Sequence, residues 1–323
     1  MRGFPLVTAV RRHPDVPWEG VRRITALALL GAACMPVALA AQDSSAVPLY
    51  VFQTPASVRS VGMAGAGVAL VGDAGAVFSN PSGLATISYV SLEGAYRPAP
   101  GGARLFSGAL GWRIRQFDLG VGGRYFDFGD EPAQYIGPDA PAGSNSREVL
   151  GQGSVVYRYG LIAAGVSGRY VRRSVDSVHV RGFSGDVGLT VAFFDIMALA
   201  VAVQNIGGNW RDDPLPVPRL TRLGFTMNYV DPQETFRLLS TLEVQWPEGA
   251  GARWVVGAEG GIVFQGVGII ARAGYGGETP GMPNSKLSVG GSLAFGVLDI
   301  DYAYRHKDLL DERAHHIGLR LTL

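Results

Sequence analysis

Apolar and polar residues alternate along most of the chain, from about residue 86 to the C-terminus. In a β-strand this period of two sends successive side chains to opposite faces. The clearest segment is 252–264, where Trp254 and Val256 share one parity and Glu259 lies on the other. The pattern predicts an all-β protein in which each strand has one apolar and one polar face.

Fourteen segments follow this pattern, and most have about the 9–11 residues that a tilted membrane strand requires. A closed barrel leaves no unpaired strand edge in hydrocarbon, so we predict a transmembrane antiparallel β-barrel of about 14 strands. A soluble β-sandwich or solenoid is the alternative, but it explains neither the shared apolar parity nor the export signal described below. The predicted strands are 86–97, 103–114, 116–126, 148–158, 161–172, 180–193, 196–204, 219–229, 236–246, 252–264, 267–275, 286–295, 297–305 and 314–323.

The connections between these segments alternate in length. Links after even-numbered strands are mostly tight, whereas links after odd-numbered strands include the long segments 127–147 and 205–218. Outer-membrane barrels have short periplasmic turns and long external loops, so we expect both segments to be external. Contact with a partner and contact with lipid headgroups explain their apolar residues equally well. The candidate external contacts are Tyr135, Ile136, Trp210 and Leu215.

The N-terminal residues are typical of an export signal. A pair of arginines precedes an apolar run, and Ala38-Leu39-Ala40 is a small-x-small cleavage motif. We predict a signal peptide over 1–41 and a location in the outer membrane of a Gram-negative-type bacterium. The unusual length of this signal is explained if residues 1–20 result from a misassigned translation start. The single cysteine, Cys34, lies inside this signal; a lipoprotein site there is the weaker alternative because a good cleavage motif follows. No spanning helix is predicted, since no other run of eighteen apolar residues occurs.

The residues between the signal and the first strand do not alternate. They are dense in small side chains, which allow close backbone packing, and Asn80-Pro81 is a strong turn signal. We therefore predict an N-terminal lumen plug segment over 42–85 and a barrel over 86–323. Apolar residues of the plug, namely Met63, Val68, Leu70 and Phe78, could supply a ligand pocket. The residues predicted to shape the plug are Gly62, Gly65, Asp73, Asn80, Pro81 and Gly83.

The same segment resembles a known family. The runs Arg59-x-x-Gly62-Met63-x-Gly65-Ala66, Asp73-Ala74 and Asn80-Pro81-x-Gly83-Leu84 are similar to the N-terminal signature of PorV/PorQ outer-membrane proteins, which are relatives of the FadL fatty-acid channels. The chain departs from this family at Ser82, where alanine is usual, and at Leu323, where an aromatic residue is typical.

The resemblance implies a function in protein secretion. PorV/PorQ proteins serve the type IX route, so the implied partners are outer-membrane lipid, secretion-machinery proteins and the C-terminal domains of secreted proteins. The FadL relatives instead transport hydrophobic small molecules, and a hydrophobic ligand is the corresponding alternative. The family signature favours secretion; an outer-membrane enzyme is the third and weakest hypothesis.

The number and position of the charged residues further limit the possible functions. The 28 Lys+Arg and 27 Asp+Glu residues balance, so no basic face for nucleic acid is expected. The polar parity of the strands carries charges of both signs, which we interpret as an ion-paired lumen filled by the plug; a selective polar channel is the alternative. These residues are Glu93, Arg97, Arg113, Asp118, Arg124, Arg169, Asp186, Arg222, Arg237, Glu243, Arg253, Glu259, Arg272, Asp299, Asp301, Arg305 and Arg320.

Candidate catalytic chemistry is sparse. No phosphate-binding loop and no His-x-x-x-His pair occur, and Gly65-Ala66-Gly67 lacks the context of a dinucleotide site. His306, His315 and His316 flank the last external loop, where a metal or acid/base site is the alternative to a solvated loop. We predict a protein without catalytic residues, cofactor or metal ion.

Overall fold

The computed structural model describes residues 49–137, 143–194, 196–207, 217, 219–233, 235–277, 286–306 and 313–323. The predicted signal peptide and the candidate contacts Trp210 and Leu215 lie outside the described residues. Within these ranges, no helix has the length and the apolar character needed to cross a bilayer.

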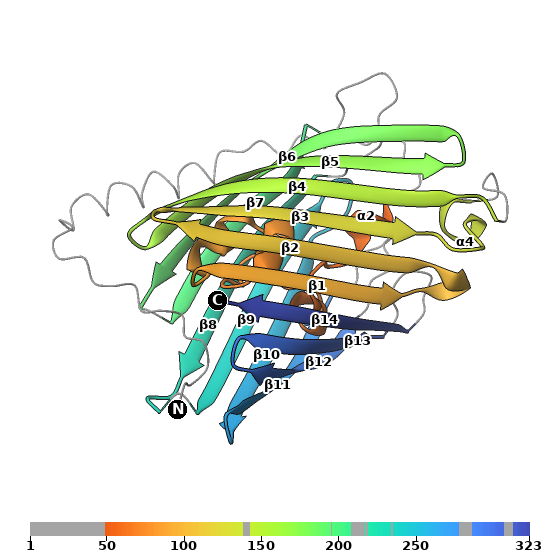
Figure 1. Cartoon of the computed structure of the whole chain (residues 1–323). Coiled ribbons are helices and arrows are strands. Elements are labelled where there is room, and N and C mark those ends of the chain that lie inside the picture. The colour runs from red at the N-terminus through yellow and green to blue at the C-terminus, as the bar shows by residue number, and fades with distance from the viewer. Residues whose placement is uncertain are drawn as a thin grey trace.

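The described residues form a closed barrel of fourteen antiparallel strands (Figure 1). Each strand pairs with its sequence neighbours, and the first pairs with the last, so the barrel confirms the predicted fold class. In chain order the strands are β1 (Val90–Pro98), β2 (Arg104–Ile114), β3 (Phe117–Asp127), β4 (Ser146–Tyr159), β5 (Ile162–Val175), β6 (Val178–Phe193), β7 (Met197–Ile206), β8 (Leu220–Val230), β9 (Phe236–Pro247), β10 (Arg253–Phe264), β11 (Val267–Gly276), β12 (Leu287–Phe295), β13 (Leu298–Arg305) and β14 (Ala314–Thr322).

The alternating faces lie as the sequence pattern predicts. On β10, Val255 is fully buried whereas the next residue, Val256, is 37% exposed on the outer face. Large apolar side chains such as Leu92 and Ile262 are exposed, while the charged residues of the polar parity, such as Glu259, are buried or half-buried. An apolar exterior around a polar interior is the arrangement of a membrane-spanning barrel.

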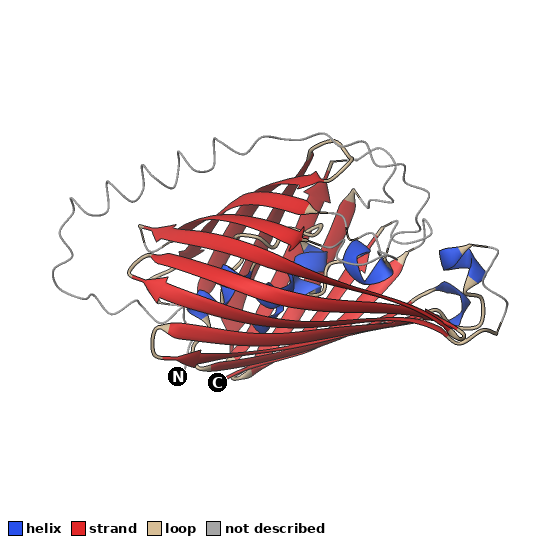
Figure 2. Cartoon of the chain, turned by 90° about the horizontal axis from the view of Figure 1, so that it is seen from above, coloured by secondary structure: helices blue, strands red, loops and turns tan. Residues whose placement is uncertain are grey.

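The chain before β1 lies inside the barrel (Figure 2). We call residues 49–89 the luminal segment. Its elements are two short helices, α2 (Tyr50–Gln53) and α3 (Val58–Gly62), and two 3₁₀ helices, η1 (Ala74–Phe78) and η2 (Pro81–Thr86). Helix α3 packs on β11 to β14, while η1 and η2 pack on β1 to β6. Outside the luminal segment, η3 (Pro100–Gly102) and α4 (Ala133–Ile136) lie in the connections after β1 and β3.

Glycines on the inner face of the barrel allow this close packing. A Cβ atom at Gly274 would overlap the backbone of Met63, and one at Gly188 would overlap the side chain of Asn80. The luminal segment therefore fits the barrel at specific positions, because these strand residues have no side chain.

The first strand begins later than predicted. Residues 86–89 continue the alternating pattern, but η2 occupies 81–86 and Ile87 is fully buried beside Gly111. The alternation there comes from a loop that turns one apolar side chain into the lumen. The other strand ends lie within about three residues of the predicted ones, which is the usual uncertainty of such boundaries.

Candidate functional site

Asn80 joins the luminal segment to β6 of the barrel. Asn80 is fully buried, and its Nδ2 donates to the Val68 carbonyl at 2.7 Å and to Thr190 Oγ1 at 3.2 Å. Its Oδ1 accepts from the Ser82 backbone N–H at 3.1 Å and from the Ser82 hydroxyl at 2.7 Å. Ser82 Oγ also lies 2.8 Å from Thr190 Oγ1, so the serine that departs from the family pattern joins η2 to β6.

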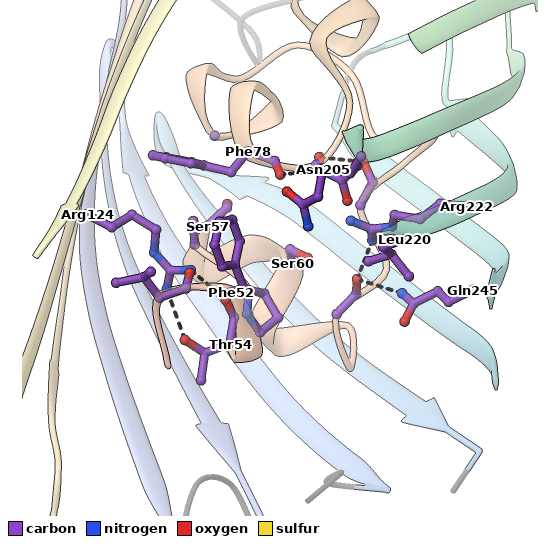
Figure 3. Close-up of a pocket in the computed structure, with 18 of the residues that line it drawn as sticks. Phe52, Thr54, Ser57, Ser60, Phe78, Arg124, Asn205, Leu220, Arg222 and Gln245 are labelled. Atoms are coloured by element: carbon purple, nitrogen blue, oxygen red, sulfur yellow. Dashed lines mark hydrogen bonds between the residues drawn. The ribbon is translucent and has the colours of Figure 1, made fainter. Parts of the chain in front are cut away.

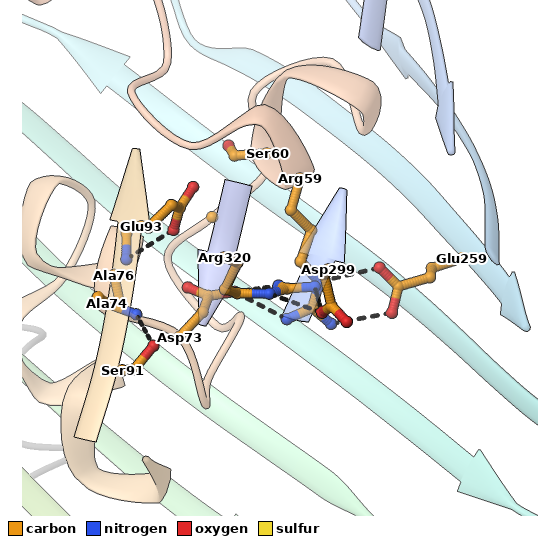
Figure 4. Close-up of polar contacts among 12 residues, drawn as sticks. Arg59, Ser60, Asp73, Ala74, Ala76, Ser91, Glu93, Glu259, Asp299 and Arg320 are labelled. Atoms are coloured by element: carbon orange, nitrogen blue, oxygen red, sulfur yellow. Dashed lines mark hydrogen bonds and ion pairs between the residues drawn. The ribbon is translucent and has the colours of Figure 1, made fainter. Parts of the chain in front are cut away.

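Arg59 and Asp73 join the luminal segment to the opposite wall of the barrel (Figure 4). Arg59 binds Asp73 at 3.0 Å and Glu259 at 2.9 Å, and Arg320 lies 3.5 Å from Asp73. Burial alone would lower the pKa of Arg59, but the carboxylates of Glu259 and Asp73 raise it above the usual value. Arg59 therefore stays charged inside the barrel.

The ion pairs continue along the barrel wall. Arg272 binds Glu259 at 2.6 Å and Asp301 at 2.9 Å. Arg320 binds Asp299 at 2.5 Å, and Arg237 lies 3.3 Å from Glu259. The lumen therefore contains paired charges of both signs, in agreement with the predicted ion-paired interior. We call these residues, together with Arg59 and Asp73, the luminal ion network.

The predicted plug glycines lie where the luminal backbone touches other atoms. Gly65 has a φ of +92°, a conformation that favours glycine, and its carbonyl accepts from Arg222 Nη2 at 2.8 Å. Gly62 packs against Arg272, and a Cβ at Gly83 would lie 2.9 Å from the Ala76 Cβ. At these three positions the absence of a side chain permits close contact with neighbouring atoms.

A cavity of about 320 Å³ lies between the luminal segment and the barrel wall (Figure 3). Apolar side chains of the luminal segment line one side, and residues of β3 to β5, of β7 to β10 and of β13 line the other. Most of these strand residues lie near the ends that join the long loops, so the cavity occupies that end of the lumen. The apolar lining side chains are Leu49, Val51, Phe52, Leu70, Phe78, Leu150 and Leu220.

Arginines also line the cavity, but protein acceptors hold them. Arg124 donates to the Thr54 carbonyl at 2.8 Å and to Thr54 Oγ1 at 2.9 Å. Arg169 donates to Asn205 Oδ1 and to the Phe78 carbonyl, each at 2.9 Å, and lies over the Phe52 ring. These two guanidinium groups are thus directed to the luminal segment and to β7, and most of the cavity surface is apolar.

The sequence indicated only part of this lining. Leu70 and Phe78 line the cavity, but the predicted Met63 and Val68 do not. They are fully buried against the barrel wall instead. The cavity residues Phe52, Leu150 and Leu220 were not predicted from the sequence. Period-two alternation shows which way a strand residue points, but it does not show which inward side chain borders empty space. The lining is assembled from segments far apart in the chain, so no local pattern marks it.

Tyr135 lies in an aromatic cluster near the cavity. It is only 3% exposed and packs 5.2 Å from the Tyr50 ring and 5.4 Å from the Phe126 ring. Its hydroxyl donates to the Pro100 carbonyl at 2.8 Å, and Ile136 packs beside the same cluster. The ring of this candidate contact residue is therefore directed into the protein, and not outward toward a partner.

The histidines do not meet at one site. His315 Nδ1 lies 2.7 Å from the Tyr302 hydroxyl on the outer face, whereas His316 is buried on the inner face. Within the described ranges, no group of three or more histidine, cysteine, aspartate or glutamate residues is arranged to hold a metal ion.

Comparison with known proteins identifies similar folds. The chain matches the toluene transporter TbuX of Ralstonia pickettii at 14% identity, over 83% of this chain and 98% of that one, with a TM-score of 0.55. The Pseudomonas putida toluene transporter TodX matches at 13% identity, over 82% and 96%, with a TM-score of 0.51. A Pseudomonas aeruginosa FadL homologue matches at 14%, over 82% and 96%, also at 0.51. The chain forms a FadL-type barrel.

Comparison at the level of sequence identifies no relative of the chain. No protein-family model matches the chain, and no curated protein matches it by sequence. The resemblance to PorV/PorQ proteins therefore receives no support from these comparisons. The resemblance to FadL proteins is supported at the level of the fold. At such low identity the likeness concerns the fold, and function has to be argued from the cavity.

Proposed function

We propose that the protein is an outer-membrane transporter for a small, mainly apolar molecule. The observation that carries this proposal is the cavity of about 320 Å³ with an apolar lining inside a FadL-type barrel. Ligand pockets commonly have volumes of about 300–1,000 Å³ and combine apolar walls with a few placed polar groups. A cavity of about 150 Å³ is enough for benzene, so this one has room for a compound of one or two rings.

The position of the cavity supports uptake from outside. Its barrel residues lie near the long-loop end of the strands, which is external in outer-membrane barrels. Beyond it, α3, η1 and η2 pack against the barrel wall. We propose that the luminal segment acts as the predicted plug, so that passage requires part of it to move.

The similar solved structures agree with this ligand class. TbuX and TodX are described as toluene transporters, and a TodX variant as a monoaromatic hydrocarbon channel. Secretion of the type IX kind is the second candidate, and the motif from Arg59 to Leu84 is the observation that favours it. Loss of surface-displayed proteins with intact hydrocarbon uptake in a deletion strain would support secretion instead.

The test is uptake of radiolabelled toluene and naphthalene by cells that lack the gene and carry a plasmid copy. Phe52→Asp places a carboxylate in the cavity lining, and we expect uptake of apolar compounds to fall about ten-fold or more. Phe52→Leu keeps the site apolar and should retain most of the uptake. Equal uptake by the empty-vector strain, or by both variants, contradicts transport through this cavity.

A further inference from the structure

Three strands of the barrel are longer than the others. β4 and β5 have 14 residues and β6 has 16, whereas a tilted strand needs about 9–11 residues to cross the membrane. All three extend at the end where β5 turns into β6 through Asp176 and Ser177, which is the end that also holds α4 (Figure 1). The extensions therefore carry their last residues beyond the apolar band on the external side.

Three arginines face outward on these extensions. Counted from the opposite, tight turns, Arg172 is the eleventh residue of β5, while Arg147 and Arg181 are the thirteenth residues of β4 and β6. Arg147 and Arg181 are exposed and Arg172 is half-exposed. They lie at the level where a membrane strand leaves the hydrocarbon and meets the headgroups. We call them the outer arginine cluster.

The strand register places the three side chains next to one another. Arg172 lies directly opposite Arg181. Arg147 lies opposite Ser174, two residues along the same face from Arg172. Directly opposed residues have Cβ atoms about 4.5–5.5 Å apart, and diagonal neighbours about 7–8 Å. Like charges at this spacing destabilise a sheet unless an anion lies between them.

Among the described residues, this cluster has one carboxylate neighbour, Asp127, which lies opposite Arg147. None of the three arginines forms an ion pair or side-chain hydrogen bond within the part of the chain that the structure describes. Asp127, opposite Arg147, pairs with Arg104 at 3.7 Å and accepts from the Gly129 backbone N–H. The exposed imidazole of His179 lies opposite Ser174, on the same face as the cluster.

Aromatic rings border the cluster on its membrane side. Tyr170 and Phe183 are two residues nearer the bilayer on β5 and β6, face outward, and have ring centroids 5.0 Å apart. Aromatic side chains of this kind mark the interface in membrane barrels. The surface thus combines an apolar pair at the acyl level with three guanidinium groups at the headgroup level.

We propose that the outer arginine cluster binds a phosphate group of a phosphorylated lipid in the outer leaflet. Arginine guanidinium groups match phosphate oxygens with paired, charge-assisted hydrogen bonds, and the aromatic pair packs on the acyl chains of the same lipid. This site lies on the outer face of the barrel and is independent of the cavity and of the ligand proposed for it.

The test is native mass spectrometry of the purified barrel in detergent with lipid A as the probe. Lipid A should bind to the wild-type protein, and binding should weaken about ten-fold or more in Arg172→Gln/Arg181→Gln. Dephosphorylated lipid A should bind equally weakly to both proteins. The control is Arg115→Gln, which removes an exposed arginine at the opposite end of the barrel and should leave binding unchanged.

Two results would overturn this proposal. One is equal retention of lipid A by the wild type and the double variant, with the heat-modifiable gel shift showing that both are folded. The other is thermal stabilisation of the wild type by inorganic phosphate alone that matches the stabilisation by lipid A, because this would assign the cluster to a soluble anion.

Discussion

Arg59 of the luminal segment and Glu259 of β10, 200 residues apart in the sequence, form a two-pronged ion pair at 2.9 and 3.1 Å. Both side chains are buried, so the pair lies away from water. The same arginine also holds Asp73, and the same glutamate also holds Arg272. One contact thus joins the luminal segment to the barrel and connects with the rest of the luminal ion network.

Removing Arg59 should loosen the luminal segment while the barrel stays closed. Arg59→Met leaves Asp73 and Glu259 with fewer cationic partners, and breaking a buried pair costs about 3–5 kcal/mol when no partner remains. We expect a smaller loss because Arg272 still binds Glu259. Planar-bilayer conductance should rise, and protease should cleave the luminal segment. Arg104→Met, which removes an exposed pair, is the control and should change neither.

Asn80 should be needed to fix the luminal segment to β6. Asn80→Leu with Pro81→Ala removes the donors to Val68 and Thr190, and each buried polar group left unpaired costs about 1–3 kcal/mol. We expect increased conductance from a barrel that still shifts on heating in gels. Ser82→Ala retains the Asn80 amide contacts and should have a much smaller effect. Unchanged conductance in the double variant would show that the segment does not close the lumen.

Neighbouring residues of β10 should differ in access to lipid. Cysteine at position 256 replaces a valine that is 37% exposed on the outer face, so a lipid-soluble maleimide should label Val256→Cys. Val255 is fully buried on the inner face, and Val255→Cys should stay unlabelled. Labelling of both variants at the same rate from the aqueous phase would contradict the membrane placement of the barrel.

Gly274 should tolerate no side chain. A Cβ there overlaps the Met63 backbone, so Gly274→Ala should displace the luminal segment or lower the free energy of unfolding by about 1–3 kcal/mol. Gly260→Ala is the matched control, because a Cβ at that position meets nothing within 4 Å. Urea unfolding of both variants in lipid, followed by tryptophan fluorescence, measures the difference. Equal stability of the two would mean that the segment does not pack here.

The barrel could be predicted because each strand is recognisable from its own local sequence. Each strand repeats the same two-residue alternation, and the environment outside is apolar along its whole length, so Val255 and Val256 reveal their faces without knowledge of any partner. The one displaced boundary, at 86–89, occurs where the chain alternates without pairing in the sheet.

The site could be predicted only in part because its geometry is not local. The Asn80-Pro81 turn is visible in the sequence, but its partner Thr190 on β6 is not. Tyr135 lies in a long loop, where the sequence predicts an exposed side chain. It is buried because the hydroxyl of Tyr50, 85 residues earlier, donates to its carbonyl and the two rings pack together. The shape of the cavity likewise depends on where the luminal segment packs against the barrel wall.

The first and last strands of the chain meet in the closed barrel. The first described residues lie inside a cylinder that is completed only when β14, the last strand of the chain, pairs with β1. Arg320 of β14 contacts Asp73 of the luminal segment, so the strand that closes the barrel also binds the chain inside it. The pairing that seals the cylinder and the contact that holds its contents therefore lie on the same strand.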